Sequence, residues 1–216
     1  MKHKHTHYTY ASFALLLFVA LGYMVKFYPE ALTGFDSNIQ TWVRGDLPGG
    51  LTAFFKMITT LGNTSVQAVI AILAVIWLYL RQYKAEAIFV GTSGVLASTM
   101  IMSLKYIYQR PRPSITHLVH AGGYSFPSGH SLGTFMILGA IAIVLTQRLV
   151  KKAAKTAVYG ITGLLIFLVG LSRIYVGVHY PTDVLAGFTL AFGLLNAIYP
   201  TYDRIRFEWR FQSKQK

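Results

Sequence analysis

Residues 64–80 read TSVQAVIAILAVIWLYL, a run of mostly aliphatic and aromatic side chains without one Asp, Glu, Lys or Arg. A helix needs about 20 such residues to cross the apolar core of a lipid bilayer. The run falls slightly short of that length, but Trp77 and Tyr79 near its end belong to the residue types that gather at the bilayer interface. Residues 64–80 are therefore predicted to form a membrane-spanning helix.

The chain contains five more apolar blocks of similar length, at about residues 10–25, 85–104, 130–146, 157–171 and 184–199. Of its 216 residues, 54% are hydrophobic and only 12% are charged, a composition too apolar for an ordinary soluble domain. We expect an all-α polytopic membrane protein with six transmembrane helices. The helices leave little chain for anything else, so residues 1–216 are expected to form a single domain.

The formal net charge of +13 raises the question of a nucleic-acid partner, and the distribution of the charge answers it. If Met1 faces the cytoplasm, 13 of the 20 Lys and Arg residues fall in the inner segments, namely residues 1–9, 81–84, 148–155 and 201–216. The positive-inside rule then places both termini in the cytoplasm. The basic residues therefore indicate membrane topology and contact with anionic lipid heads, and no nucleic-acid partner is expected.

Residues 26–63 separate the first two apolar blocks and mix polar, aromatic and helix-breaking residues. Residues 39–43 and 51–58 resemble surface-lying helices, which predicts a short interfacial cap, although a plain connecting loop accounts for the composition equally well. Near the amino terminus, His3, His5 and His7 alternate and are expected to be disordered. The chain has no cysteine, which excludes disulfides and a thiol nucleophile.

Three polar clusters fall on the predicted outer side, at residues 105–113, 127–131 and 172–183. Basic residues are disfavoured on that side of a membrane, yet these clusters contain Lys105, Arg110, Arg112 and Arg173. A single cation at a helix end usually only reaches the lipid headgroups. Four of them at converging helix ends indicate a site for an anion.

The second and third clusters contain the groups that phosphate chemistry uses. Ser128 and Gly129 precede an apolar run, so they are expected to begin a helix whose free amide groups attract a phosphate, although a simple capped helix fits the same residues. His179 and Asp183 are four residues apart, and one helical turn brings their side chains together. A carboxylate that holds one imidazole nitrogen leaves the other nitrogen free to act as a nucleophile. A structural ion pair is the alternative, and it explains less beside Arg173 and a second histidine, His130.

The spacing of these residues closely resembles the three-part signature of the type 2 phosphatidic acid phosphatase superfamily. The first part is Lys105, six residues, then Arg112 and Pro113; the second is Pro127, Ser128, Gly129 and His130; the third is Ser172 and Arg173, five residues, His179, three residues and Asp183. Among the members of that superfamily, the chain is similar to bacterial membrane enzymes that act on phosphatidylglycerophosphate or undecaprenyl pyrophosphate.

The resemblance implies a role for each signature residue. His179 would attack phosphorus to form a phosphohistidine, Asp183 would orient His179, and His130 would protonate the leaving oxygen. Lys105, Arg112, Ser128, the Gly129 amide and Arg173 would bind the phosphoryl oxygens. No metal ion or other cofactor is expected, because Lys and Arg supply the positive field. Since one histidine must be neutral and the other protonated, the rate should have a bell-shaped pH dependence.

The expected function is therefore the hydrolysis of phosphatidylglycerophosphate or a related lipid phosphate, in the cell membrane and at its extracytoplasmic face, with no obligate protein partner. An undecaprenyl pyrophosphate phosphatase is one alternative. A lipid transporter or scramblase is another, although it would place its polar residues near the bilayer midplane. Arg110 lies outside the signature, and both phosphate steering and plain surface charge stay open for it. His117 and His120 are expected to lie in a solvated loop.

Overall fold

The computed structural model describes residues 4–212, and this part of the chain forms α-helices joined by loops, without a β-strand. The helices are α1 (Lys4–Phe27), α2 (Pro29–Arg44), α3 (Gly49–Thr60), α4 (Thr64–Leu80), α5 (Lys84–Tyr108), α6 (Gly129–Thr146), α7 (Lys152–Tyr175) and α8 (Pro181–Gln212). The prediction of an all-α fold is confirmed. Each predicted apolar block lies within one of these helices.

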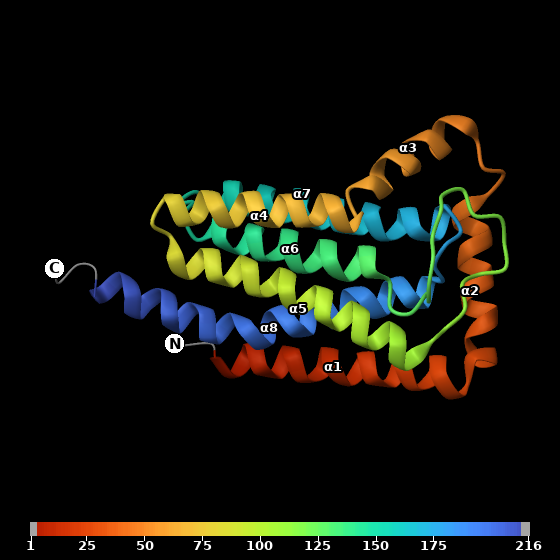
Figure 1. Ribbon diagram of the computed structural model, residues 1–216, viewed down its shortest axis with the longest axis horizontal. Helices are drawn as coiled ribbons and strands as arrows, with labels where there is room; N and C mark the ends of the chain where they lie inside the picture. The colour runs from red at the N-terminus through yellow and green to blue at the C-terminus, as the bar shows by residue number, and fades with distance from the viewer. Residues whose placement is uncertain (1–3, 213–216) are drawn as a thin grey trace.

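Helix α2 lies across one end of a bundle whose long helices, α1 and α4 to α8, run roughly along one axis (Figure 1). Within residues 4–212, five helices are long and apolar enough to cross a membrane, namely α1, α5, α6, α7 and α8. The short helix α4 qualifies together with α3, from which it is bent by 49°, as one broken span. The structure thus gives a polytopic membrane protein with five or six spans, and the number six stays a prediction.

Helix α6 lies at the centre of the bundle and packs against α4, α5, α7 and α8. Leu132, Met136, Ala140 and Val144 recur along one face of α6 at a spacing of four residues, and all four are buried. Small residues let the neighbouring helix α8 approach closely: a β-carbon at Gly187 would lie 2.9 Å from the Ser128 carbonyl oxygen at the start of α6. This close packing holds the beginnings of α6 and α8 together.

Residues 26–63 form the end of α1 and the two helices α2 and α3, so the alternative of a plain connecting loop is wrong. Leu32, Asp36 and Gln40 are buried at a spacing of four residues in α2, whereas Trp42 is 84% exposed. The face of α2 that carries Leu32, Asp36 and Gln40 therefore packs against the bundle. As a result, α2 brings side chains to the same end as the three polar clusters (Figure 1).

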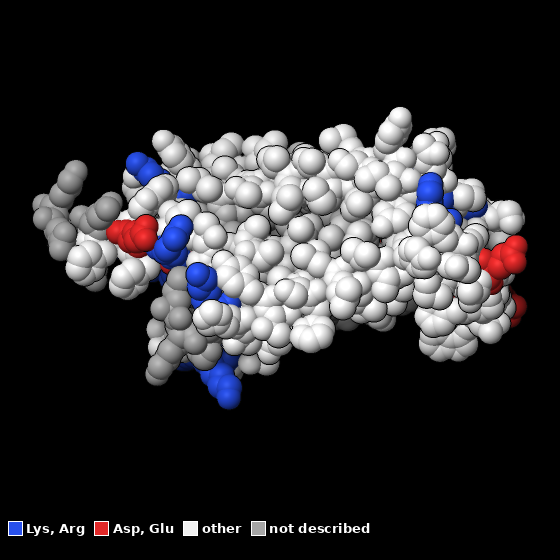
Figure 2. Space-filling model, turned by 90° about the horizontal axis from the view of Figure 1, so that it is seen from below, with Lys and Arg blue, Asp and Glu red and all other residues white. Residues whose placement is uncertain are grey.

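Both ends of the described chain lie at the other end of the bundle, away from α2 (Figure 1). On the face drawn in Figure 2, charged residues lie at both ends of the molecule, with more Lys and Arg at the end that holds the termini, and a broad belt between the ends has no charged residue. The positive-inside rule expects this distribution if the end that holds the termini faces the cytoplasm, and that orientation stays a prediction. Residues 1–3 and 213–216, which the topology prediction places in the cytoplasm, lie outside the described residues.

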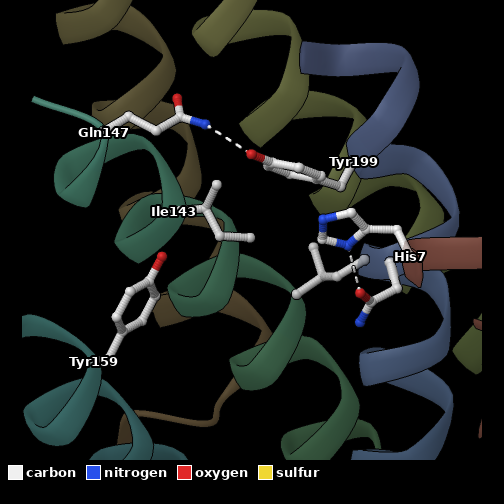
Figure 3. Close-up of a pocket in the computed structure, with 7 residues that line it drawn as sticks. His7, Ile143, Gln147, Tyr159 and Tyr199 are labelled. Atoms are coloured by element: carbon white, nitrogen blue, oxygen red, sulfur yellow. Dashed lines mark hydrogen bonds between the residues drawn. The ribbon is translucent and has the colours of Figure 1, made fainter. Parts of the chain in front are cut away.

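The prediction of a disordered amino terminus is wrong for His5 and His7, which both lie in α1. Figure 3 shows His7 at a cavity of about 180 Å³, where its Nδ1 lies 2.8 Å from the side-chain oxygen of Asn196. The His7 ring also contacts the Tyr199 ring, at 4.5 Å between centroids. These contacts tie α1 to α8. His3 lies outside the described residues.

Candidate active site

His179 and Asp183 lie close together at the junction between α7 and α8. A short loop, residues 176–180, carries His179, and Pro181 begins α8 at a position where the missing amide hydrogen costs nothing. The Nδ1 atom of His179 lies 3.3 Å from Oδ2 of Asp183, and the backbone amide of Tyr180 donates to the same oxygen at 2.9 Å. Both side chains are almost fully buried, with exposures of 2% and 0%. The carboxylate therefore fixes the orientation of the imidazole ring.

The opposite nitrogen of the His179 ring faces a guanidinium group. Nη1 of Arg112 lies 3.3 Å from Nε2 of His179. Because a guanidinium only donates hydrogen bonds, Nε2 must be the acceptor, and the ring hydrogen must sit on Nδ1, toward Asp183. This tautomer leaves a lone pair on Nε2. Burial, together with the charges of Arg173, Arg112 and Lys105, holds the pKa of His179 well below its ordinary value, which favours the neutral ring.

Three cations from different segments surround His179, and backbone carbonyls and a hydroxyl hold them in place. The Lys105 ammonium donates to the Tyr124 carbonyl at 2.7 Å. Arg112 donates to the carbonyls of Gly122, Gly123 and Val178. Arg173 donates to the Thr59 hydroxyl at 2.5 Å.

Within residues 4–212, none of these three cations forms an ion pair with a carboxylate. Arg173 is only 4% exposed, and its buried Nε atom has no hydrogen-bond partner. An uncompensated buried charge is costly to a folded protein. The arrangement therefore favours an anion in front of Nε2 of His179.

The start of α6 contributes donors to the same region. Ser128 caps the helix, because its side-chain oxygen accepts from the amide and the hydroxyl of Ser131. The Ser128 amide donates to the Asp183 carbonyl at 3.0 Å, which ties the beginning of α6 to α8. The hydroxyl hydrogen of Ser128 and the amide of Gly129 belong to a helix amino terminus, where anions are stabilised.

His130 lies in the first turn of α6, half-buried, with Nε2 at 3.0 Å from the side-chain oxygen of Asn63. Gly62 makes room for the ring, since a β-carbon there would lie 2.5 Å from Cδ2 of His130. His130 interacts electrostatically with Arg173, His179, Lys105 and Arg112. The structure thus brings together all the residues predicted for the site: His179, His130, Asp183, Lys105, Arg112, Ser128, Gly129 and Arg173. Their roles stay predictions.

Two further residues belong to this region: Arg110, for which phosphate steering and surface charge were both open, and Asp36, which no motif indicates. Arg110 is 8% exposed and forms ion pairs with both Asp183, at 2.7 Å, and Asp36, at 2.8 Å. Plain surface charge is therefore the wrong description of Arg110. One signal pointed to Asp36: it shares a helix face with Leu32 and Gln40, which is unusual for a solvated carboxylate. His117 and His120 are exposed loop residues, as predicted.

Comparison with known proteins identifies relatives of the chain. The family model described as PAP2 superfamily matches residues 86–207. Phosphatidylglycerophosphatase B of Bacillus subtilis is 46% identical over 93 residues, which are 43% of this chain and 45% of that protein. Undecaprenyl-diphosphatase BcrC of Bacillus subtilis is 32% identical over 133 residues, which are 59% of this chain and 64% of that protein. The chain therefore spans less than two thirds of either relative.

One solved structure is similar over nearly its whole length. It is the crystal structure of a transmembrane PAP2-type phosphatidylglycerolphosphate phosphatase from Bacillus subtilis, with a TM-score of 0.81 and 29% sequence identity. The match covers 90% of this chain and 96% of that chain. The structural similarity therefore extends beyond residues 86–207, which the family model matches.

Proposed function

Because this chain belongs to the PAP2 superfamily, we propose that it is a lipid phosphate phosphatase of the membrane that hydrolyses phosphatidylglycerophosphate or a closely related lipid phosphate. One observation carries the proposal: Lys105, Arg112 and Arg173 lie around Nε2 of His179, and within residues 4–212 none of the three has a carboxylate at ion-pair distance. A phosphoryl group brings the negative charge that these cations match, and it places phosphorus in front of a lone pair.

The reaction proceeds in two displacements at phosphorus. In the first, Nε2 of His179 forms a bond to phosphorus, the bond to the lipid oxygen breaks, and His130 gives that oxygen a proton. In the second, a water oxygen forms a bond to phosphorus while His130 takes up one of its protons, the bond between phosphorus and Nε2 breaks, and inorganic phosphate leaves. Asp183 stabilises the positive charge that the His179 ring carries in between. The three cations, Ser128 and the Gly129 amide bind the equatorial oxygens.

The position of the site supports an enzyme over a transporter. The site residues gather at one end of the bundle beneath α2, and a transporter would place them near the middle of the spans (Figure 1). Since most Lys and Arg residues belong to the opposite end, we place the site on the extracytoplasmic side of the cell membrane. In this proposal, the whole chain is one domain with six spans, and residues 26–63 form its interfacial cap.

A second substrate has specific support. Undecaprenyl-diphosphatases of Bacillus subtilis and of Sulfolobus acidocaldarius are also similar to this chain, the latter at 29% identity over 83% of its own length. A diphosphate presents the same terminal phosphoryl group to His179 and differs in its leaving group. Undecaprenyl diphosphate is therefore the alternative substrate, with the same residues in the same roles.

Phosphate release by the purified protein in detergent tests the proposed function. Phosphatidylglycerophosphate, phosphatidic acid and undecaprenyl diphosphate are compared with and without a chelator. We expect the highest kcat/KM with phosphatidylglycerophosphate and no loss with the chelator, because Arg and Lys supply the positive field. Residues 4–212 contain no group of three or more His, Cys, Asp or Glu side chains suited to a metal ion. Transport of lipid without phosphate release would contradict the proposal, and inhibition by the chelator would contradict its metal independence.

A further inference from the structure

Arg110 joins two carboxylates that come from distant parts of the chain. Its Nη1 donates to Oδ1 of Asp183 at 2.7 Å, and its Nη2 donates to Oδ2 of Asp36 at 2.8 Å. The guanidinium also lies over the Tyr180 ring, 3.9 Å from the ring centroid. With two ion pairs and a stacked ring, the guanidinium has one defined position.

Asp36 also holds the start of α8. Its Oδ1 accepts from the Thr182 amide at 2.9 Å, and its Oδ2 accepts from the Thr182 hydroxyl at 2.8 Å. Helix α2 thus caps α8 one residue before Asp183, where a negative charge is favourable. Gln40, one turn further along α2, donates to the His179 carbonyl at 3.4 Å. Helix α2 therefore contacts the backbone of His179 and of Thr182, the residue before Asp183.

The charges of this network bear directly on the nucleophile. Asp183 uses Oδ2 for His179 and Oδ1 for Arg110, so the guanidinium competes with the imidazole for the negative charge of one carboxylate. Asp36 in turn shares the positive charge of Arg110. A carboxylate without a cation would attract a second proton onto the His179 ring, and a protonated ring has no lone pair to attack phosphorus.

We infer that Arg110 and Asp36 are positioning residues that set the charge Asp183 presents to His179 and thereby keep the nucleophile neutral. This inference rests on the proposed function, because it assigns the two residues to the same reaction. They touch Asp183 and the start of α8, and they act on phosphorus only through His179.

Other charged or titratable groups also face His179 and contribute to its pH dependence. They are Lys105 on α5, Arg112 in the loop that follows α5, His130 on α6, Arg173 on α7, and Asp183 on α8. All of them are unchanged when Arg110 or Asp36 is replaced. A shift between variants therefore reports the network. The second ionisation of a phosphate monoester, near pH 6, also acts equally on every variant.

The test is the pH dependence of kcat for phosphate release, measured for the wild-type protein, Arg110→Gln and Asp36→Asn. Activity disappears on the acid side when His179 takes up a proton. The acid limb of the profile is the pH range in which kcat falls as the pH is lowered. Without Arg110, the full charge of Asp183 stabilises the protonated ring, so the acid limb should lie about 1 pH unit higher than in the wild-type protein. Without the Asp36 charge, Arg110 neutralises Asp183 more completely, so the acid limb should lie at or below that of the wild-type protein.

A double variant keeps the test decisive if Arg110→Gln does not fold. The double variant Asp36→Asn/Arg110→Gln loses one negative and one positive charge, so the buried net charge changes less than in Arg110→Gln alone. Because Arg110 is absent, the acid limb of this variant should still lie at higher pH than that of the wild-type protein. Arg148→Gln is the matched control, because Arg148 forms its ion pair with Glu86 on α5, a pair separate from the His179 network. Its acid limb should not move.

Two results would overturn the inference. If the wild-type protein is active and the acid limb is the same in all variants, or rises in Asp36→Asn as well, then the network only supports the fold. If the wild-type protein releases no phosphate from any lipid phosphate, the proposed function is wrong, and the inference about Arg110 and Asp36, which rests on it, is wrong as well.

Discussion

Replacement of His179 by alanine is expected to lower kcat for lipid phosphate hydrolysis by a factor on the order of 10³ to 10⁶, the range seen when an enzyme loses its nucleophile. The physical reason is that Nε2 of His179 presents its lone pair beside the Arg112 guanidinium and near the charges of Arg173 and Lys105, where a phosphoryl group would bind. The measurement is the release of inorganic phosphate from phosphatidylglycerophosphate at saturating concentration.

His120→Ala is the matched control for this prediction. His120 lies exposed in the loop between α5 and α6 and forms no part of the site. Its variant should keep the wild-type kcat within about twofold, as expected of a surface substitution. Thermal unfolding of both variants shows whether they are folded. A folded His179→Ala protein with wild-type activity would exclude His179 as the nucleophile.

The second large effect is expected from Arg173→Gln, which should lower kcat/KM by about 10²- to 10³-fold, as does the loss of one donor to a developing oxyanion. Arg173 is buried and donates to the Thr59 hydroxyl, but its Nε atom has no hydrogen-bond partner, so a bound anion would supply the compensation that its charge lacks. The ligand-free variant should therefore be as stable as the wild-type protein or more stable, because a buried unpaired charge is gone. Steady-state kinetics and the thermal midpoint measure the two effects.

Arg148→Gln provides the comparison for Arg173→Gln. Arg148 also has a buried Nε atom without a hydrogen-bond partner, but it forms an ion pair with Glu86 at 3.0 Å. Its replacement should lower the stability and leave kcat/KM unchanged. Equal losses of activity in the two variants would contradict a phosphate-binding role for Arg173.

The fold was largely predictable because a membrane protein must place long apolar helices in the bilayer. Residues 64–80, for example, form α4 with the predicted bounds. The region between α1 and α4 was harder to predict. Helix α2 is amphipathic and contains Gly34 and several polar residues, so its composition also fitted a loop. Contacts with the bundle end decide in favour of the helix, since Asp36 and Gln40 find buried partners there.

The site was predictable where its residues are close in sequence. His179 and Asp183 are four residues apart, and the helical turn between them makes their contact a local property. The pair formed by Arg110 and Asp36 has no such signal, because 74 residues separate the two. Only the position of α2 across the bundle end brings them together. Without its two carboxylate partners, Arg110 fits phosphate steering and surface charge equally well.

The position of α2 also explains how the sequence builds a buried site at the end of a bundle. Arg44, near the end of α2, donates to the carbonyls of Tyr175 and Thr116, which fixes the helix over the loops that carry His179 and Arg112. Without α2 over these helix ends, His179 would be exposed to water. Water molecules bound to Nε2 would then have to leave before its lone pair could attack phosphorus.

The most direct test of the central claim is to trap the covalent intermediate. The protein is mixed with lipid phosphate carrying a radioactive phosphoryl group, quenched in alkali within the first turnover, and digested for peptide analysis; phosphohistidine survives alkali and is lost in acid. We predict that the label is found on the peptide containing His179 and is absent from the His179→Ala protein. Turnover without labelled protein, or a label on a different residue, would contradict the mechanism.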